Sequence, residues 1–196
     1  MGKTKLIKEI IAKKVSLQPF LNVYNIDTKK RGDFTTADGT LIQSEHAPDA
    51  YKTTGNRMVW QPYYDDIDTY STFFTRVLEA GLPAIVNIDE TINMKFGSRI
   101  PRGLSILLAQ GRLPGIWVIG GTQEVAASPR QLLSQATYLI SFSLLNPYDE
   151  RTMARMLHLE TSSLGLKKHQ FWFLDTDSGS AAVKYNGYKD FIPRVH

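Results

Sequence analysis

The chain has 196 residues, of which 42% are apolar and 21% are charged, and its formal net charge is +4 with a pI near 9.2. These values fit one soluble globular domain with a substantial core, and the spread of aromatic residues argues against a long disordered tail. The absence of cysteine excludes disulfides, thiol catalysis and cysteine-ligated zinc. The mild basic bias is compatible with a polyanionic partner.

Two further classes are disfavoured. The four histidines, His46, His158, His169 and His196, lack the spacing of metal ligands. No apolar run approaches the roughly 20 residues that a membrane helix needs, and lysines interrupt the apolar residues at the start as they do not in a signal peptide. We therefore expect an intracellular protein without a membrane partner.

The first elements along the chain are a helix and two strands. Apolar residues at helical spacing predict an amphipathic helix over residues 3–15, and the run FLNVYNID predicts a strand over 20–27. The polar segment 29–56 is predicted as a loop with a small excursion. RMVWQP predicts a short strand over 57–62.

From residue 70 onward helices and strands alternate. The predicted helices span 70–78 with a stop at Gly81, 103–111 after Pro101, 129–136, and 147–157 starting at Pro147. The predicted strands span 83–89, 115–121 and 137–144, followed by two strands with a Gly/Ser turn within 170–187. Apolar strands separated by helices predict an α/β fold with a parallel sheet covered on both faces. Nothing resembles a linker, so residues 1–196 are predicted to form one domain.

Gly2, Lys3 and Thr4 stand directly before the first predicted helix. They match the last three residues of the phosphate-binding loop G-x-x-x-x-G-K-[ST]. In such a loop, amides at a helix N-terminus hold phosphates, the lysine reaches the β and γ oxygens, and the hydroxyl ligates Mg²⁺. The alternative is an unstructured basic start.

Asp89 and Glu90 follow the apolar residues of the predicted strand over 83–89. Open α/β sheets bind ligands beyond the carboxyl ends of their strands. We expect Asp89 to hold Mg²⁺ through a water or the Thr4 hydroxyl, and Glu90 to orient and deprotonate the attacking water. The alternative is a solvated acidic turn.

Gln123 ends the run GIWVIGGTQ, and the edge of the sheet is again its predicted place. A glutamine there can donate a hydrogen bond to the γ-phosphate or to the attacking water, although it can also simply cap a loop. The order Lys-Thr, strand-Asp-Glu, strand-Thr-Gln is more specific than any one of its parts.

These motifs make the chain similar to the FtsK–HerA branch of P-loop ATPases over residues 2–160. The resemblance lies in Gly-Lys-Thr before a helix, the turn NIDTKKRGDF, NIDE, and GGTQ before a proline-containing helix. The small size resembles viral and phage DNA-packaging ATPases. The resemblance implies a RecA-like core with a mostly parallel sheet and a C-terminal β-hairpin, which uses ATP and Mg²⁺. It also implies a homo-oligomeric ring that moves double-stranded DNA into a capsid, with a capsid portal as a possible partner.

Members of this family use an arginine from a neighbouring subunit to stabilise the transferring phosphoryl group. Arg112 precedes the strand of Gln123, where related proteins also carry an arginine, and is the first choice. Arg99, Arg102 and Arg130 are competitors, and each can instead be a solvent-exposed charge. The loop 93–103 carries Lys95, Arg99 and Arg102, which either neutralise DNA phosphates in a ring channel or belong to an ordinary surface loop.

The resemblance further implies that a central strand and five residues of the phosphate loop precede Met1. We therefore expect the polypeptide as written to bind ATP weakly and to aggregate, and a strand ending in G-x-x-x-x before Gly2 to restore solubility and binding. The rival functions are a HerA-type helicase or conjugative motor and a nucleotide-free DNA-binding subunit. A small-molecule kinase is disfavoured because it needs an arginine-bearing lid.

Overall fold

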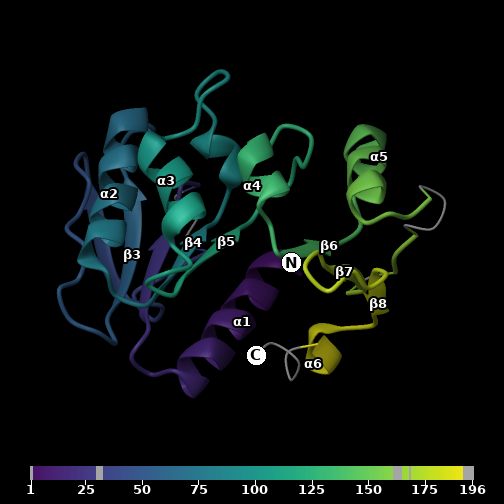
Figure 1. The fold of residues 1–196 in the computed structure, drawn as a ribbon, viewed down its shortest axis with the longest axis horizontal. Helices are drawn as coiled ribbons and strands as arrows, with labels where there is room; N and C mark the ends of the chain where they lie inside the picture. Colours follow the sequence, from purple (N-terminus) through teal and green to yellow (C-terminus); the bar gives the residue numbers. More distant parts are fainter. Residues whose placement is uncertain (1, 30–32, 161–164, 168, 192–196) are drawn as a thin grey trace. The chain divides into compact units, whose positions relative to one another are not determined.

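Figure 1 shows the fold as a computed structural model that describes residues 2–29, 33–160, 165–167 and 169–191. The chain divides into two compact units. We call Val15–Thr122 the sheet unit, and Met1–Lys14 together with Gln123–His196 the hairpin unit. None of the helices in the described ranges combines the length and apolarity needed to cross a membrane. The prediction of a single domain over 1–196 stays a prediction.

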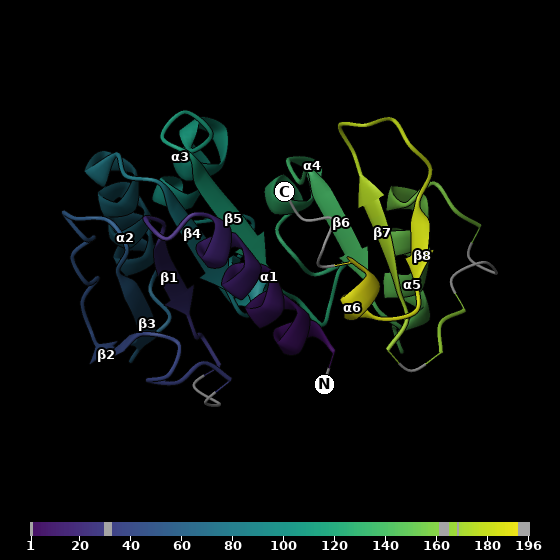
Figure 2. The ribbon, with the colours of Figure 1, turned by 90° about the horizontal axis from the view of Figure 1, so that it is seen from below.

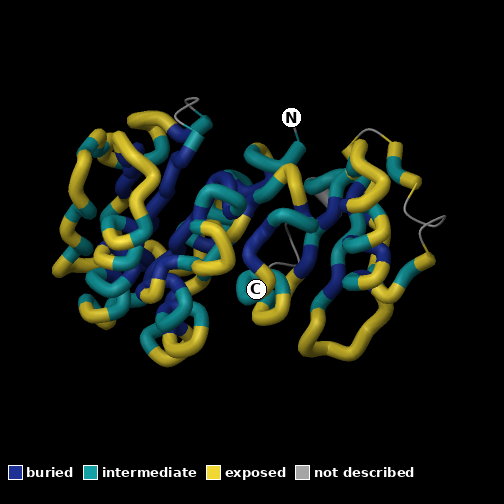
Figure 3. Tube along the Cα trace, turned by 90° about the horizontal axis from the view of Figure 1, so that it is seen from above, coloured by how far each residue is buried: buried dark blue, intermediate teal, exposed yellow. Residues whose placement is uncertain are grey.

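The sheet unit is built on five parallel strands in the order β2-β3-β1-β4-β5. They are β1 (Asn22–Ile26), β2 (Thr40–Ser44), β3 (Arg57–Pro62), β4 (Ala84–Ile88) and β5 (Ile116–Gly120). Every residue of β1 and β4 is buried, as expected of central strands in a parallel sheet, and Figure 3 marks such buried stretches in dark blue. The predicted α/β class with a parallel sheet is confirmed.

Strand β2 corrects one sequence interpretation. Residues 29–56 were predicted as a loop, but Thr40–Ser44 pair in parallel with β3, with Leu41 opposite Val59. β2 lies at the edge of the sheet and none of its residues is fully buried. An edge strand of this kind has little apolar signal, because most of its side chains face solvent.

Helix α2 (Ile67–Ala80) has a defined start and stop. The Asp66 carboxylate accepts a hydrogen bond from the Thr69 amide at 2.7 Å and so caps the first turn. At the other end Gly81 adopts a left-handed conformation with φ of 64°, which confirms the predicted stop.

Helices α2 and α3 (Arg102–Gln110) cover one face of the sheet (Figure 1). The rings of Tyr24 and Trp60 contact Phe73 of α2, with centroid distances of 5.7 and 4.8 Å. The two helices meet at Gly103, where a Cβ atom would stand 2.1 Å from the Ser71 carbonyl oxygen. Only glycine permits this close approach of the two backbones.

The hairpin unit contains three antiparallel strands in the order β6-β7-β8 (Figure 2). Its elements are α1 (Lys3–Leu17, which runs past the boundary at Lys14), α4 (Arg130–Ser134), β6 (Tyr138–Ser141), α5 (Pro147–Met156), β7 (Phe171–Asp175), β8 (Val183–Tyr185) and α6 (Tyr188–Phe191). The predicted N-terminal helix and C-terminal hairpin are confirmed, while α6 was not predicted.

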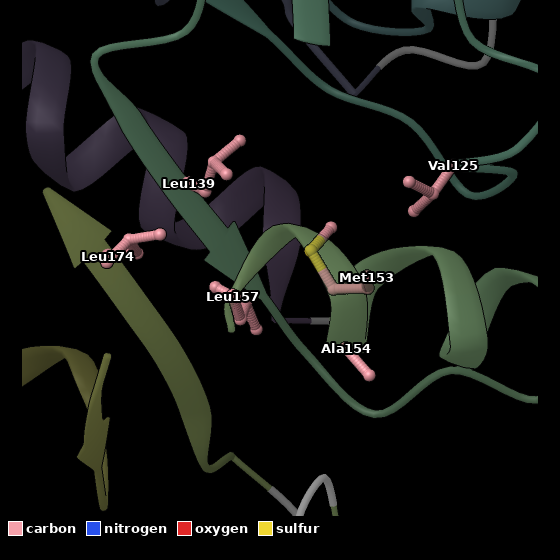
Figure 4. Close-up of a cluster of buried hydrophobic side chains, with 6 residues drawn as sticks. All are labelled: Val125, Leu139, Met153, Ala154, Leu157 and Leu174. Carbon is pink, nitrogen blue, oxygen red and sulfur yellow. The ribbon is translucent and has the colours of Figure 1, made fainter. Parts of the chain in front are cut away.

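Two apolar clusters hold this unit together. Figure 4 shows the first, which joins α5 to β6 and β7 and contains Val125, Leu139, Met153, Ala154, Leu157 and Leu174. The second packs Leu6 of α1 against aromatic side chains of the last elements, Phe171, Tyr185 and Phe191. Burial of such side chains contributes about 1.5–3 kcal/mol each. Helix α1 is thus anchored to the C-terminal hairpin.

Candidate functional site

Two aspartates lie side by side just after β1 and β4 end, at the carboxyl edge of the parallel sheet. The register pairs Ile26 of β1 with Ile88 of β4, and the Asp89 amide donates to the Ile26 carbonyl at 3.1 Å. Asp27 therefore stands beside Asp89, and both are fully buried. Glu90 is only 5% exposed. Asp89 and Glu90, the predicted acidic pair, are thus buried at this edge of the sheet and do not form a solvated turn.

A lysine from the turn after β1 contacts both members of the acidic pair. The Nζ atom of Lys29 lies 2.7 Å from Oε2 of Glu90 and 3.9 Å from Oδ2 of Asp89. The Lys29 side chain is 12% exposed, so this is a largely desolvated ion pair. Sequence reasoning missed Lys29. The available signal was the basic residue directly after the strand in NIDTKK.

The backbone that carries Lys29 is fixed by its two predecessors. The Asp27 carboxylate accepts a hydrogen bond at 2.8 Å from Gln61 of β3. The Thr28 hydroxyl accepts one at 2.9 Å from the amide of Asn93. Asn93 belongs to the 3₁₀ helix η1 (Thr91–Met94), which begins directly after Glu90. Consecutive residues after β1 therefore contact two elements at the same edge, β3 and η1.

The end of β5 lies against this edge as well. The Gly121 amide donates to the Ile88 carbonyl at 2.9 Å, and the Thr91 amide donates to the Gly121 carbonyl at 2.8 Å. A Cβ atom on Gly120 would stand 2.8 Å from Cγ2 of Thr91, so the end of β5 approaches the start of η1 closely there. Gln123 follows two residues after Gly121 as the first residue of the hairpin unit's second segment. Its contact with a nucleotide stays a prediction.

Lys3 and Thr4 begin helix α1 in the hairpin unit, and Gly2 directly precedes it. A Cβ atom on Gly2 would stand 2.9 Å from the ring of Phe142, so a glycine suits this position. Asp89 and Glu90 belong to the sheet unit, and a shared nucleotide site with Lys3 and Thr4 stays a prediction.

The three predicted DNA-contacting residues lie on a short hairpin and the helix that follows it. Phe96 and Arg99 exchange backbone hydrogen bonds of 2.9 and 3.1 Å around a turn in which Gly97 has φ of 64°. The Phe96 ring packs near Tyr70 of α2, with centroids 6.1 Å apart. Lys95, Arg99 and Arg102 are all exposed. The fold therefore gathers these charges on one structured segment of the sheet unit.

Arg112 lies at the amino ends of the strands, opposite the carboxyl edge, in the turn that leads into β5. The Gly115 amide donates to the Arg112 carbonyl at 3.2 Å, and Leu113 at the tip of the turn is 94% exposed. Arg112 is exposed too. The fold does not bring Arg112 together with Asp89 and Glu90 of the same chain.

The donor chemistry of this edge fits a magnesium ion bound together with a nucleotide. In the ranges that the structure describes, there is no group of three or more histidine, aspartate or glutamate side chains that could hold a metal ion by themselves. Mg²⁺ in nucleotide sites uses one or two carboxylates, with phosphates and waters as the other ligands. The Asp89 carboxylate is an oxygen donor of this kind, and Thr4, which belongs to the hairpin unit, stays a predicted ligand.

Comparison with solved structures relates the fold to viral packaging NTPases. B204, the DNA-packaging ATPase from Sulfolobus turreted icosahedral virus, matches with a TM-score of 0.77 and 16% identity, over 95% of this chain and 92% of that chain. The genome packaging NTPase B204 from Sulfolobus turreted icosahedral virus 2, in complex with ATP-gammaS, matches with a TM-score of 0.72 and 17% identity over the same shares. No family model and no curated protein matches the chain. The likeness shows a RecA-like α/β core.

Proposed function

We propose that this chain is an ATPase that drives translocation of double-stranded DNA, as in viral genome packaging. The observation that carries the proposal is the buried pair of Asp89 and Glu90 at the carboxyl edge of the parallel sheet. Ligands of open α/β sheets bind at that edge. The likeness of the fold to B204 supports the same class of function.

The residues of the chain divide the proposed hydrolysis among them. Lys3 contacts the phosphates, and Thr4 and Asp89 are the magnesium ligands. Bound Mg²⁺ supplies positive charge that offsets the charge of the phosphates. Glu90 takes a proton from the attacking water, whose oxygen forms a bond to the γ-phosphorus while the bond to the ADP oxygen breaks. Gln123 donates a hydrogen bond to the γ-phosphate.

DNA binding and ring assembly belong to the proposal too. The exposed Lys95, Arg99 and Arg102 neutralise DNA phosphates without reading sequence. Arg112 acts on the nucleotide of a neighbouring copy in a homo-oligomeric ring. Such a ring can dock on a capsid portal. A HerA-type helicase or conjugative motor uses the same chemistry and differs in the partner that it engages.

ATP hydrolysis with and without double-stranded DNA tests this function. We would measure it for the chain and for one extended by a strand ending in G-x-x-x-x before Gly2, each with its Glu90→Gln variant. A general base contributes about 10²–10⁴ in rate, so Glu90→Gln should lower kcat by that factor and leave nucleotide binding intact. Replacing Lys95 and Arg99 by alanine should abolish the stimulation by DNA.

Two outcomes would contradict the proposal. A Glu90→Gln variant with near-wild-type hydrolysis would exclude Glu90 as the base. DNA binding with no hydrolysis in either form of the chain would favour the nucleotide-free DNA-binding subunit.

A further inference from the structure

We propose that Lys29 is a positioning residue for Glu90, an inference that rests on the proposed ATPase function. Lys29 Nζ lies 2.7 Å from Glu90 Oε2, and the Glu90 side chain is 6% exposed. Ion pairs at a protein surface contribute little to stability, but a buried carboxylate depends on its charged partner. The Lys29 contact therefore restrains where the Glu90 carboxylate lies.

The Glu90 carboxylate does not cap the helix that follows it. Glu90 is the N-cap residue of η1, yet its side chain makes no capping hydrogen bond to that helix. The contact with Lys29 therefore restrains the carboxylate from outside η1. A lysine ammonium has three donors, and Lys29 lies within ion-pair distance of Asp89 as well, at 3.9 Å. It thus ties the two members of the acidic pair to one point.

Both ends of the ion pair are anchored to the same helix. Thr28, which precedes Lys29, accepts the hydrogen bond from Asn93 of η1 at 2.9 Å. Glu90 precedes η1 in the chain. The ammonium and the carboxylate therefore start from backbone positions that are fixed relative to each other. Such a short, doubly anchored pair suits a base that must keep one geometry, because a misplacement of about 1 Å can lower a rate by about 10².

Kinetics of three lysine variants test the assignment in the form of the chain that hydrolyses ATP. Lys29→Met removes the charge at similar length, and we expect kcat to fall by about 10-fold to 100-fold while KM stays within about twofold. Lys29→Arg keeps a cation and should recover most of the loss. Lys52→Met is the matched control, because Lys52 is exposed in a loop of the same unit, and it should leave both constants unchanged.

A double-mutant cycle shows whether Lys29 acts through Glu90. In the Glu90→Gln background, Lys29→Met should lower kcat by less than about twofold more, because the group that it positions is already gone. Urea unfolding of the same four proteins gives a readout without catalysis. In the protein that keeps Glu90, Lys29→Met should lower the folding equilibrium constant at least about 10-fold. In the Glu90→Gln background the same substitution should lower it less than about threefold.

The results separate failure of the assignment from failure of the function. An unchanged or increased kcat in Lys29→Met, or a KM effect as large as the kcat effect, overturns the assignment. So does Lys29→Arg with no recovery. If the parent proteins hydrolyse no ATP, the proposed function fails and takes the catalytic part of the assignment with it. The unfolding cycle then decides the remaining claim, that Lys29 holds Glu90.

Discussion

Replacing Gly120 by alanine should press a methyl group into the edge of the sheet beside Glu90. The new Cβ would stand 2.8 Å from Cγ2 of Thr91. Non-bonded carbon atoms pack at about 3.5–4.0 Å, so one of the two must move by roughly 1 Å. Thr91 is only 4% exposed, and its amide donates a hydrogen bond to the Gly121 carbonyl. Overpacking of this kind lowers the free energy of unfolding by about 1–3 kcal/mol, and we expect Gly120→Ala to do the same.

Urea unfolding followed by circular dichroism measures this effect, and a suppressor isolates its cause. Thr91→Ser removes Cγ2 and keeps the hydroxyl, so Gly120→Ala should be less than half as destabilising in the Thr91→Ser background. Gly165→Ala is the control, because no atom lies within 4 Å of a Cβ built there. The reasoning is refuted if Thr91→Ser leaves the effect of Gly120→Ala undiminished, or if the control destabilises the chain equally.

Two more predictions concern a helix cap and the trans arginine. The hydrogen bond from Thr69 lowers the pKa of Asp66 below its ordinary value of 3.8. The stability that the ionised Asp66 side chain contributes to the fold is therefore present above pH 3.8 and is lost as the pH falls through the folded pKa. Asp66→Ala should thus destabilise by about 1 kcal/mol at neutral pH and far less near pH 2, as measured in urea. Arg112→Ala should be inactive alone, yet regain ATPase activity when mixed with Glu90→Gln. No gain on mixing would exclude a trans role for Arg112.

The strands and helices that the sequence predicted correctly are those with strong local signals. β4 is an apolar run, and α2 has both an apolar face and a glycine at its end. The motif at the end of β4 could be predicted too, because a parallel sheet sends its strand ends to one edge. β2 could not, since an exposed edge strand lacks the apolar pattern on which such a prediction depends.

The contact between Lys29 and Glu90 could not be predicted from the sequence. Three basic residues follow Thr28 in NIDTKKR, and nothing in their pattern predicts the contact between Lys29 and Glu90. The choice depends on pairing between β1 and β4 and on the hydrogen bond between Thr28 and Asn93, which join segments far apart in the chain. Contacts of this kind are set by register, and register is a property of the folded sheet.

The same sheet geometry constrains how Arg112 can take part in hydrolysis. Arg112 precedes β5 and Glu90 follows β4, so parallel pairing puts them at opposite edges of the sheet. The five residues of β5 rise about 3.3 Å each, which separates the edges by roughly 16 Å, more than an arginine side chain spans. Within one chain Arg112 therefore cannot reach the water that Glu90 is proposed to activate. A catalytic Arg112 must act on a neighbouring copy, and its turn, with Leu113 exposed at the tip, is open to such a contact.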